Sequence, residues 1–209
     1  MSLTANDILK GNPIVPVVVL DKVEDAVPLA HALLEGGIKL IEVTLRTAAG
    51  LNAISRIAKE VPEIIVGAGT VLSAEQYRQA MAAGAQYLIS PGLTPAIAEV
   101  AAKHSLPYLP GVATPSECML AMEYSIPVVK FFPASLIGGT PLLKQFASVF
   151  SNLKFVPTGG IDAGNAKDYL SLPNVVSVGG SWVAPKDAIA KGDWKKITEL
   201  CREALKSVK

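Results

Sequence analysis

The sequence predicts an α/β protein with a single domain, residues 1–209, folded as a (β/α)8 TIM barrel. Short apolar runs rich in β-branched residues alternate with helical stretches along the chain. Eight such runs occur, and most are apolar on both faces, as buried parallel strands are. Dividing the 209 residues by eight gives about 26 residues per unit, close to the minimum for a strand with its crossover helix. A lean eight-unit barrel accounts for this alternation best.

The eight candidate strands are short and bounded by turn residues. They span residues 14–19, 38–43, 63–67, 86–89, 107–110, 127–131, 154–157 and 174–178. An open, doubly wound sheet is the alternative arrangement of the same elements. That fold more naturally begins with a GxGxxG turn after its first strand, and the sequence has none there. We therefore prefer the barrel.

Helical patterns fill the stretches between these strands. The first predicted helix spans residues 21–35, and Asp21 with Glu24 resembles a capping box at its start. Pro28 lies inside this helix and is expected to bend or loosen it. The last helix runs from residue 193 to about 207, with its apolar stripe turned inward.

Charge and hydropathy argue against several classes of function. The chain has 19 basic and 18 acidic residues, a net charge of +1, and no basic run. These values favour neither nucleic acid nor a membrane surface as a partner. No apolar stretch approaches the ~18 residues of a membrane span, and the polar start does not read as a signal peptide. We expect a cytoplasmic protein.

Cysteine and histidine give no sign of a metal centre. Cys118 and Cys201 form no CxxC pair and are interpreted as core residues of a protein in a reducing compartment. His31 and His104 make no ligand cluster with them, so neither a zinc site nor another metal or cofactor is expected. Residues 1–3 resemble an added leader, and the sequence leaves their origin open.

Chemistry in such barrels lies where strands end and the following loops begin. Ionisable and hydroxyl residues gather at these positions, while the strand starts are mostly apolar. The predicted strand ends carry Glu42–Thr47, Gly67–Thr70, Ser90–Gly92, Lys130, Pro157–Gly160 and Val178–Ser181.

Lys130 is the most unusual of these residues, because the run 126–133 is apolar around it. An ammonium loses its hydration when it leaves water, so a lysine in such a strand needs a reason. It could reach water at the strand end or meet a carboxylate in the core. The chemical alternative is that desolvation favours the neutral amine, a nucleophile toward carbonyl groups. If Lys130 points into the barrel, Val129 and Phe131 face the helices.

Glu42 and Arg46 share one face of the second strand. Ile38 and Leu40 precede Glu42 in the same phase, and Arg46 continues it. An ion pair between Glu42 and Arg46 is the simplest structural interpretation. In an extended strand, however, their Cα atoms would lie about 13 Å apart. We therefore expect both side chains to face a common ligand.

Glycine pairs follow the last two predicted strands. Gly159-Gly160 and Gly179-Gly180, the latter followed by Ser181, would let backbone N–H groups approach an anion closely. Loops after these two strands commonly bind phosphate in this fold, although glycines also serve in ordinary turns. Together, the strand ends suit metal-free Schiff-base chemistry on a phosphorylated keto acid.

Six motifs resemble, in order, those of the 2-keto-3-deoxy-6-phosphogluconate (KDPG) aldolase family. They are Glu42–Thr47, Val66–Val71, Ile89–Gly92, Val129–Ala134, Pro157–Ile161 and Gly179–Trp182. The resemblance covers nearly the whole chain. It implies a (β/α)8 barrel, a homotrimer and a metal-free class I aldolase. Several members of the family also cleave 4-hydroxy-2-oxoglutarate.

The resemblance also implies roles for individual residues. Lys130 matches the Schiff-base lysine, and Glu42 matches the carboxylate that transfers protons. Arg46 and Thr70 match residues that contact the pyruvate portion of the substrate.

Further matches lie around these residues. Phe132 matches an aromatic residue beside the lysine, Pro91 a residue of the pocket wall, and Thr158 a residue that affects stereoselectivity. The phosphate-binding positions of the family match Gly159, Gly160, Gly180 and Ser181.

The resemblance leaves the preferred substrate open. The phosphogluconate substrate would give pyruvate and glyceraldehyde 3-phosphate, but 4-hydroxy-2-oxoglutarate and the galactonate epimer are alternatives. A more remote alternative is a non-catalytic barrel that binds a phosphosugar. Such a protein would bind its ligand without forming an adduct that borohydride can trap. A metal-dependent aldolase would need a ligand cluster that the sequence does not offer.

Overall fold

The computed structural model describes residues 4–104 and 106–208; residues 1–3, with the predicted leader, lie outside them. The strands are β1 Ile14–Val18, β2 Leu40–Thr44, β3 Ile65–Gly69, β4 Tyr87–Ile89, β5 Tyr108–Leu109, β6 Gly111–Val112, β7 Val128–Phe131, β8 Lys154–Pro157 and β9 Val178–Gly180. The α-helices are α1 Ala5–Leu9, α2 Ala26–Glu35, α3 Gly50–Glu60, α4 Ala74–Ala82, α5 Pro95–Ala102, α6 Pro115–Glu123, α7 Gly139–Val149, α8 Ala166–Leu170, α9 Lys186–Lys191 and α10 Trp194–Ser207. Two short 3₁₀ helices are η1 Val23–Asp25 and η2 Ala134–Leu136.

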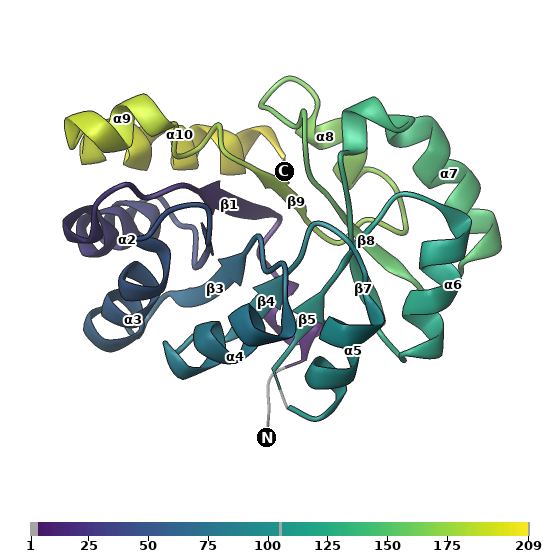
Figure 1. Cartoon of the computed structure of the whole chain (residues 1–209). Coiled ribbons are helices and arrows are strands. Elements are labelled where there is room, and N and C mark those ends of the chain that lie inside the picture. The colour runs from purple at the N-terminus through teal and green to yellow at the C-terminus, as the bar shows by residue number, and fades with distance from the viewer. Residues whose placement is uncertain (1–3, 105, 209) are drawn as a thin grey trace.

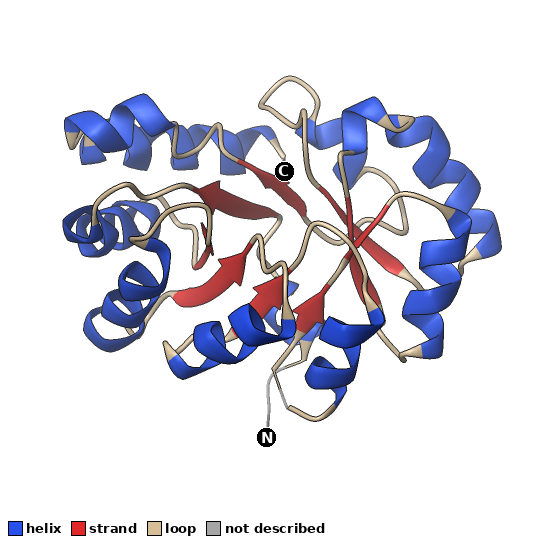
Figure 2. Cartoon of the chain, in the orientation of Figure 1, coloured by secondary structure: helices blue, strands red, loops and turns tan. Residues whose placement is uncertain are grey.

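The strands form a curled, parallel sheet with helices around its outer side (Figures 1 and 2). Six strands pair in the order β5-β4-β3-β2-β1-β9, and three in the order β6-β7-β8. Two isolated parallel bridges, Phe155 to Val175 and Thr158 to Gly179, connect β8 with the β9 segment. At the other junction, only Pro110 separates β5 from β6. The coarse prediction of an α/β fold with parallel strands is confirmed.

Apolar side chains form two clusters, one on each face of the sheet. The larger cluster packs strand residues such as Val129 and Phe131 against the helices. The smaller one contains Leu40 and Val128 and lies on the opposite strand face. The predicted alternation around Lys130 is therefore confirmed. Ile38 was placed wrongly, because it precedes β2 and belongs to the larger cluster.

The eighth predicted strand, 174–178, is wrong in position. Val175 makes only an isolated bridge, and regular pairing begins at Val178. Gly179 and Gly180 consequently lie inside β9, whereas the sequence placed them in the loop that follows. Glycine is depleted in strands, which is why the pattern ended too early. Here it permits close approach, because a Cβ at Gly179 would overlap the side chain of Thr158.

The start of the first predicted helix also differs from the prediction. Its residues divide into η1 and α2, and neither has a side-chain cap. The capping box of Asp21 and Glu24 is therefore not formed, and Asp21 instead pairs with Lys186. Pro28 falls in the first turn of α2, where its missing N–H has no partner to lose, so the expected bend is unnecessary. The last helix agrees with its prediction, with Asp193 as N-cap.

Cys118 and Cys201 are both free and buried in the larger cluster, as predicted. Burial raises the pKa of each thiol to about 12. Within the described ranges, no group of three or more histidine, cysteine and acidic residues could hold a metal ion. No helix in the described part of the chain is long and apolar enough to cross a membrane.

Candidate active site

The centre of the site is a buried lysine beside a buried carboxylate. Lys130 on β7 is 5% exposed, and Glu42 on β2 is 1% exposed. Lys130 Nζ lies 3.5 Å from Glu42 Oε1. At this separation Oε1 makes no hydrogen bond with any described residue. Of the possibilities that the sequence left open, the structure shows a lysine beside a carboxylate in the core. The two groups are too far apart for Lys130 to donate a hydrogen bond to Glu42 Oε1.

Two glycines of β3 create the space that Glu42 occupies. A Cβ on Gly69 would overlap the Glu42 carboxylate, and a Cβ on Gly67 would overlap the Tyr87 ring. Glu42, Gly67 and Tyr87 are register partners across β2, β3 and β4. The small residues of β3 therefore let a carboxylate and an aromatic ring approach from the two neighbouring strands.

Tyr87 is a member of the site that the sequence did not predict. It is buried in the smaller cluster, and its hydroxyl has no partner among the described residues. Burial, and secondarily the charge of Glu42, raises the pKa of Tyr87 well above its usual range. The only indication in the sequence was the position of Tyr87 in the predicted strand 86–89. An ordinary core residue would occupy the same position.

Arg46 and Thr70 are brought together beyond the ends of β2 and β3. Arg46 Nε donates a hydrogen bond to Thr70 Oγ1 over 3.2 Å. Thr70 has φ of 58°, a left-handed conformation that is strained for a β-branched residue. Among the described residues, Arg46 and Glu42 form no ion pair. This agrees with the expectation that they lie too far apart along an extended strand.

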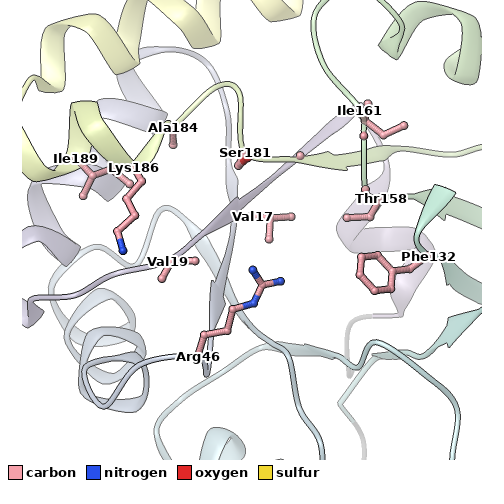
Figure 3. A pocket seen from close by; sticks show the side chains of 13 residues that line it. Val17, Val19, Arg46, Phe132, Thr158, Ile161, Ser181, Ala184, Lys186 and Ile189 are labelled. Carbon is pink, nitrogen blue, oxygen red and sulfur yellow. The ribbon is translucent and has the colours of Figure 1, made fainter. Parts of the chain in front are cut away.

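A cavity of about 280 Å³ opens beside these residues (Figure 3). All four residues predicted to bind phosphate line it, from the ends of two neighbouring strands: Gly159, Gly160, Gly180 and Ser181. Gly159 and Gly160 both have positive φ, which glycine adopts freely. Figure 3 shows the Arg46 guanidinium between Lys186 on one side and Phe132 on the other.

Phe132 connects the cavity with the buried pair. It lines the cavity, as does Thr158, and its ring centroid lies 5.1 Å from Lys130 Nζ. Lys130 and Glu42 themselves are not lining residues. Pro91, predicted as pocket wall, does not line this cavity either; its carbonyl instead lies where a Cβ on Gly111 would be.

Lys186 is the second residue that the sequence did not predict. It lines the cavity from the start of α9 and pairs with Asp21 at 2.9 Å. No motif marks it, because a lysine at the start of a short surface helix is an ordinary residue. The site thus combines a buried amine and carboxylate with cationic groups and glycine-rich backbone around a neighbouring cavity. Such a set can capture a carbonyl compound that carries anionic groups.

Comparisons with known proteins identify the family of this chain. The family model described as KDPG and KHG aldolase matches residues 5–200. A KHG/KDPG aldolase of Escherichia coli (strain K12) is 50% identical, over 99% of this chain and 97% of the relative. A KDPG aldolase structure from Legionella pneumophila, with pyruvate captured as a covalent carbinolamine intermediate, has a TM-score of 0.93 and 44% identity, covering 94% of this chain and 96% of that one.

A second solved structure gives the same result. The 2-keto-3-deoxy-6-phosphogluconate aldolase of Zymomonas mobilis ZM4, with 3-phosphoglycerate, has a TM-score of 0.90 and 46% identity, covering 95% of this chain and 93% of that one. These similarities extend over nearly the full length of each protein. The chain belongs to the KDPG and KHG aldolase family.

Proposed function

We propose that the protein is a class I aldolase that reversibly cleaves 2-dehydro-3-deoxy-6-phosphogluconate to pyruvate and glyceraldehyde 3-phosphate, the aldolase step of the Entner–Doudoroff pathway. The observation that carries this proposal is the buried Lys130–Glu42 pair beside a cavity lined by glycine-rich backbone. The pyruvate carbinolamine of the Legionella relative supports covalent chemistry through an amine.

Lys130 is the nucleophile in this proposal. Glu42 lies close enough to accept the proton that the lysine must lose before it attacks. The neutral amine adds to the C2 ketone and forms a carbinolamine. Glu42 then returns its proton to the carbinolamine hydroxyl, which leaves as water and gives the protonated imine. In the protonated imine, the nitrogen draws electron density from C3, which prepares the C3–C4 bond to break.

Glu42 then acts as the general base. It takes the proton of the C4 hydroxyl, the C3–C4 bond breaks, and glyceraldehyde 3-phosphate leaves. The electron pair of that bond forms an enamine of pyruvate on Lys130. Glu42 returns that proton to C3, and hydrolysis of the resulting imine releases pyruvate and restores the amine.

The two ends of the substrate are held by different groups. Arg46, oriented by Thr70, binds the pyruvate carboxylate, for which a planar guanidinium is well suited. Phe132 and Pro91 bound the reacting part, and Thr158 contributes to the choice of C4 configuration.

At the far end of the substrate, backbone N–H groups and a hydroxyl hold the phosphate. The residues assigned to it are Gly159, Gly160, Gly180 and Ser181. Binding energy from this remote group positions the reacting carbons.

The finer features of the fold belong to the same proposal. Residues 1–209 form one domain whose sheet closes into a (β/α)8 barrel, supported by the two bridges from β8 and by the single residue between β5 and β6. We propose a homotrimer in the cytoplasm that needs no metal or other cofactor. A solution mass three times the 21.8 kDa of the chain tests the oligomeric state.

Pyruvate release from the phosphorylated substrate tests the activity. The unmodified protein is expected to turn over, and Lys130→Met is expected to fall to background because no other amine occupies its position. Normal unfolding of the variant, followed by circular dichroism, controls for misfolding. Turnover retained in folded Lys130→Met would remove the lysine from the mechanism. Binding of the substrate without turnover by the unmodified protein would favour a non-catalytic binder.

4-Hydroxy-2-oxoglutarate is a second candidate substrate, favoured by the KHG/KDPG name of the E. coli relative. The galactonate epimer differs from the main candidate in the orientation of one hydroxyl. Side-by-side kcat/KM values for the three compounds are expected to be highest for the phosphogluconate. A higher value for either other compound would reassign the principal substrate while keeping the Schiff-base chemistry.

A further inference from the structure

Lys186 brings a positive charge to the cavity that the glycine segments line. It is five residues beyond Ser181 in the chain and lines the same cavity as Gly160 and Gly180. The described residues that line this cavity include two cations, Arg46 and Lys186, and no acidic side chain. Figure 3 shows the two cations entering from different elements. The cavity therefore has two cations available to a ligand that carries two anionic groups.

The two cations are held differently. Arg46 is hydrogen-bonded to the neutral hydroxyl of Thr70, which orients it, and it pairs with no acidic side chain in the described part of the chain. Lys186 is instead compensated by Asp21. Because Arg46 is occupied with the carboxylate in the proposed function, the phosphate end is left with neutral donors: backbone N–H groups and the Ser181 hydroxyl. Neutral donors balance only part of the charge of a phosphate monoester, which is near −2 at pH 7.

The pair of Lys186 with Asp21 is one that a ligand can replace. Its atoms are 2.9 Å apart, but the two side chains are 66% and 56% exposed. Exposed ion pairs contribute little to stability because water solvates the separated charges well. A lysine ammonium also moves easily on its four-carbon stem. A dianionic phosphate in the cavity would compete with the single charge of one solvated carboxylate.

We propose that Lys186 leaves Asp21 when substrate binds and pairs with the phosphate, so that it determines the preference for phosphorylated over unphosphorylated substrates. In the absence of substrate, Asp21 keeps the Lys186 ammonium beside the cavity. This inference rests on the proposed function, since it assumes a keto acid with a remote phosphate. It adds a residue that the sequence motifs do not contain.

The test compares Lys186→Met with Lys191→Met, a matched control in the same helix. Lys191 pairs with Asp187 at 3.9 Å, is mostly exposed, and does not line the cavity. The substrates are 2-dehydro-3-deoxy-6-phosphogluconate and its unphosphorylated form. In Lys186→Met, KM for the phosphorylated substrate is expected to rise about tenfold, and the ratio of the two kcat/KM values to fall by a similar factor. Lys191→Met is expected to change neither quantity.

Two further variants separate phosphate binding from a structural role of the ion pair. Lys186→Arg keeps the charge and is expected to recover most of the preference. Asp21→Asn removes the competing carboxylate and is expected to lower KM for the phosphorylated substrate. If Asp21→Asn raises KM as much as Lys186→Met does, the ion pair serves the structure and the inference is wrong. An unchanged substrate ratio in Lys186→Met would overturn it as well.

The outcomes distinguish this inference from the proposed function. If the unmodified protein does not cleave the phosphorylated substrate, the proposed function fails before Lys186 is considered. If it cleaves this substrate and Lys186→Met keeps the same substrate ratio, the function stands and only the role of Lys186 is rejected.

Discussion

Two lysine–carboxylate pairs in this protein differ in their exposure to water, and the distance between the charged atoms of each pair does not reflect this difference. Lys186 and Asp21 lie 2.9 Å apart at the surface, while Lys130 and Glu42 lie 3.5 Å apart in the interior. The shorter pair is solvated and is worth about 0–1 kcal/mol, whereas removing one partner of a buried pair costs about 3–5 kcal/mol. Burial decides which pair dominates the behaviour of the protein. The exposed pair can exchange partners, and the buried pair holds an amine and a proton acceptor in fixed positions.

The largest contrast is expected when the carboxylate of each pair becomes an amide. Glu42→Gln keeps the side-chain shape and removes the proton acceptor, so kcat should fall roughly 10²- to 10⁴-fold, the usual contribution of a general base. Asp21→Asn should change kcat by less than about twofold, because Asp21 touches no reacting atom. Steady-state pyruvate release measures both. Near-normal kcat in Glu42→Gln would exclude Glu42 as the proton-transferring group.

A smaller effect is expected when the space around Glu42 is reduced. Gly69→Ala adds a Cβ that overlaps the Glu42 carboxylate. The displaced carboxylate should lower kcat by about 10²-fold, the scale of a misplacement near 1 Å. Gly92→Ala is the matched control, because a Cβ there meets nothing within 4 Å. Equal kcat values in the two folded variants would show that the position of Glu42 is not critical.

Stability should separate the two pairs as well. A double-mutant cycle with Lys130→Met and Glu42→Gln is expected to give a coupling of about 3 kcal/mol, since each single change leaves the other buried group without its partner. The corresponding cycle with Lys186→Met and Asp21→Asn should give less than about 1 kcal/mol. Urea unfolding at pH 7 measures both couplings. Similar values for the two pairs would remove burial as the distinguishing property.

The smallest effect is expected from Tyr87→Phe. The Tyr87 hydroxyl has no partner among the described residues, so its removal should change the free energy of unfolding at pH 7 by less than about 1 kcal/mol. Burial raises the pKa of this phenol in the folded state. The folded state therefore keeps its proton where the unfolded state loses it, and stability falls as pH rises above about 10. Tyr87→Phe should lose less stability than the unmodified protein between pH 9 and about 11. An equal loss in the two proteins would contradict the raised pKa of Tyr87.

Sequence patterns predicted the kinds of residue in the site more fully than the boundaries of the strands. The apolar run marked Lys130 as unusual, and the phase of its strand predicted that Glu42 faces a ligand at the strand end. The structure adds that both residues are buried and lie side by side. Propensity failed at β9, because Gly179 and Gly180 are used there for close packing against neighbouring side chains. Local rules predict a strand end where glycines begin, and only the tertiary contacts correct this.

The residues that the sequence could not identify depend on long-range contacts. Tyr87 is significant because Gly67 opens space for its ring beside Glu42, a relation between three strands. Lys186 is significant because the start of α9 lies over the cavity and near Asp21. Asp21 illustrates the same limit, since the local pattern assigned it to a helix cap and the fold assigns it to an ion pair. Neither a helix nor a strand pattern carries this information.

Covalent trapping of pyruvate tests the central claim most directly. The protein is incubated with pyruvate, reduced with borohydride, digested, and examined by mass spectrometry, with Lys130 and Lys186 resolved on separate peptides. The account predicts one reduced pyruvate adduct, on the peptide that contains Lys130, because that amine is buried beside a carboxylate. An adduct on the Lys186 peptide, or no adduct while the protein still cleaves its substrate, would contradict the account.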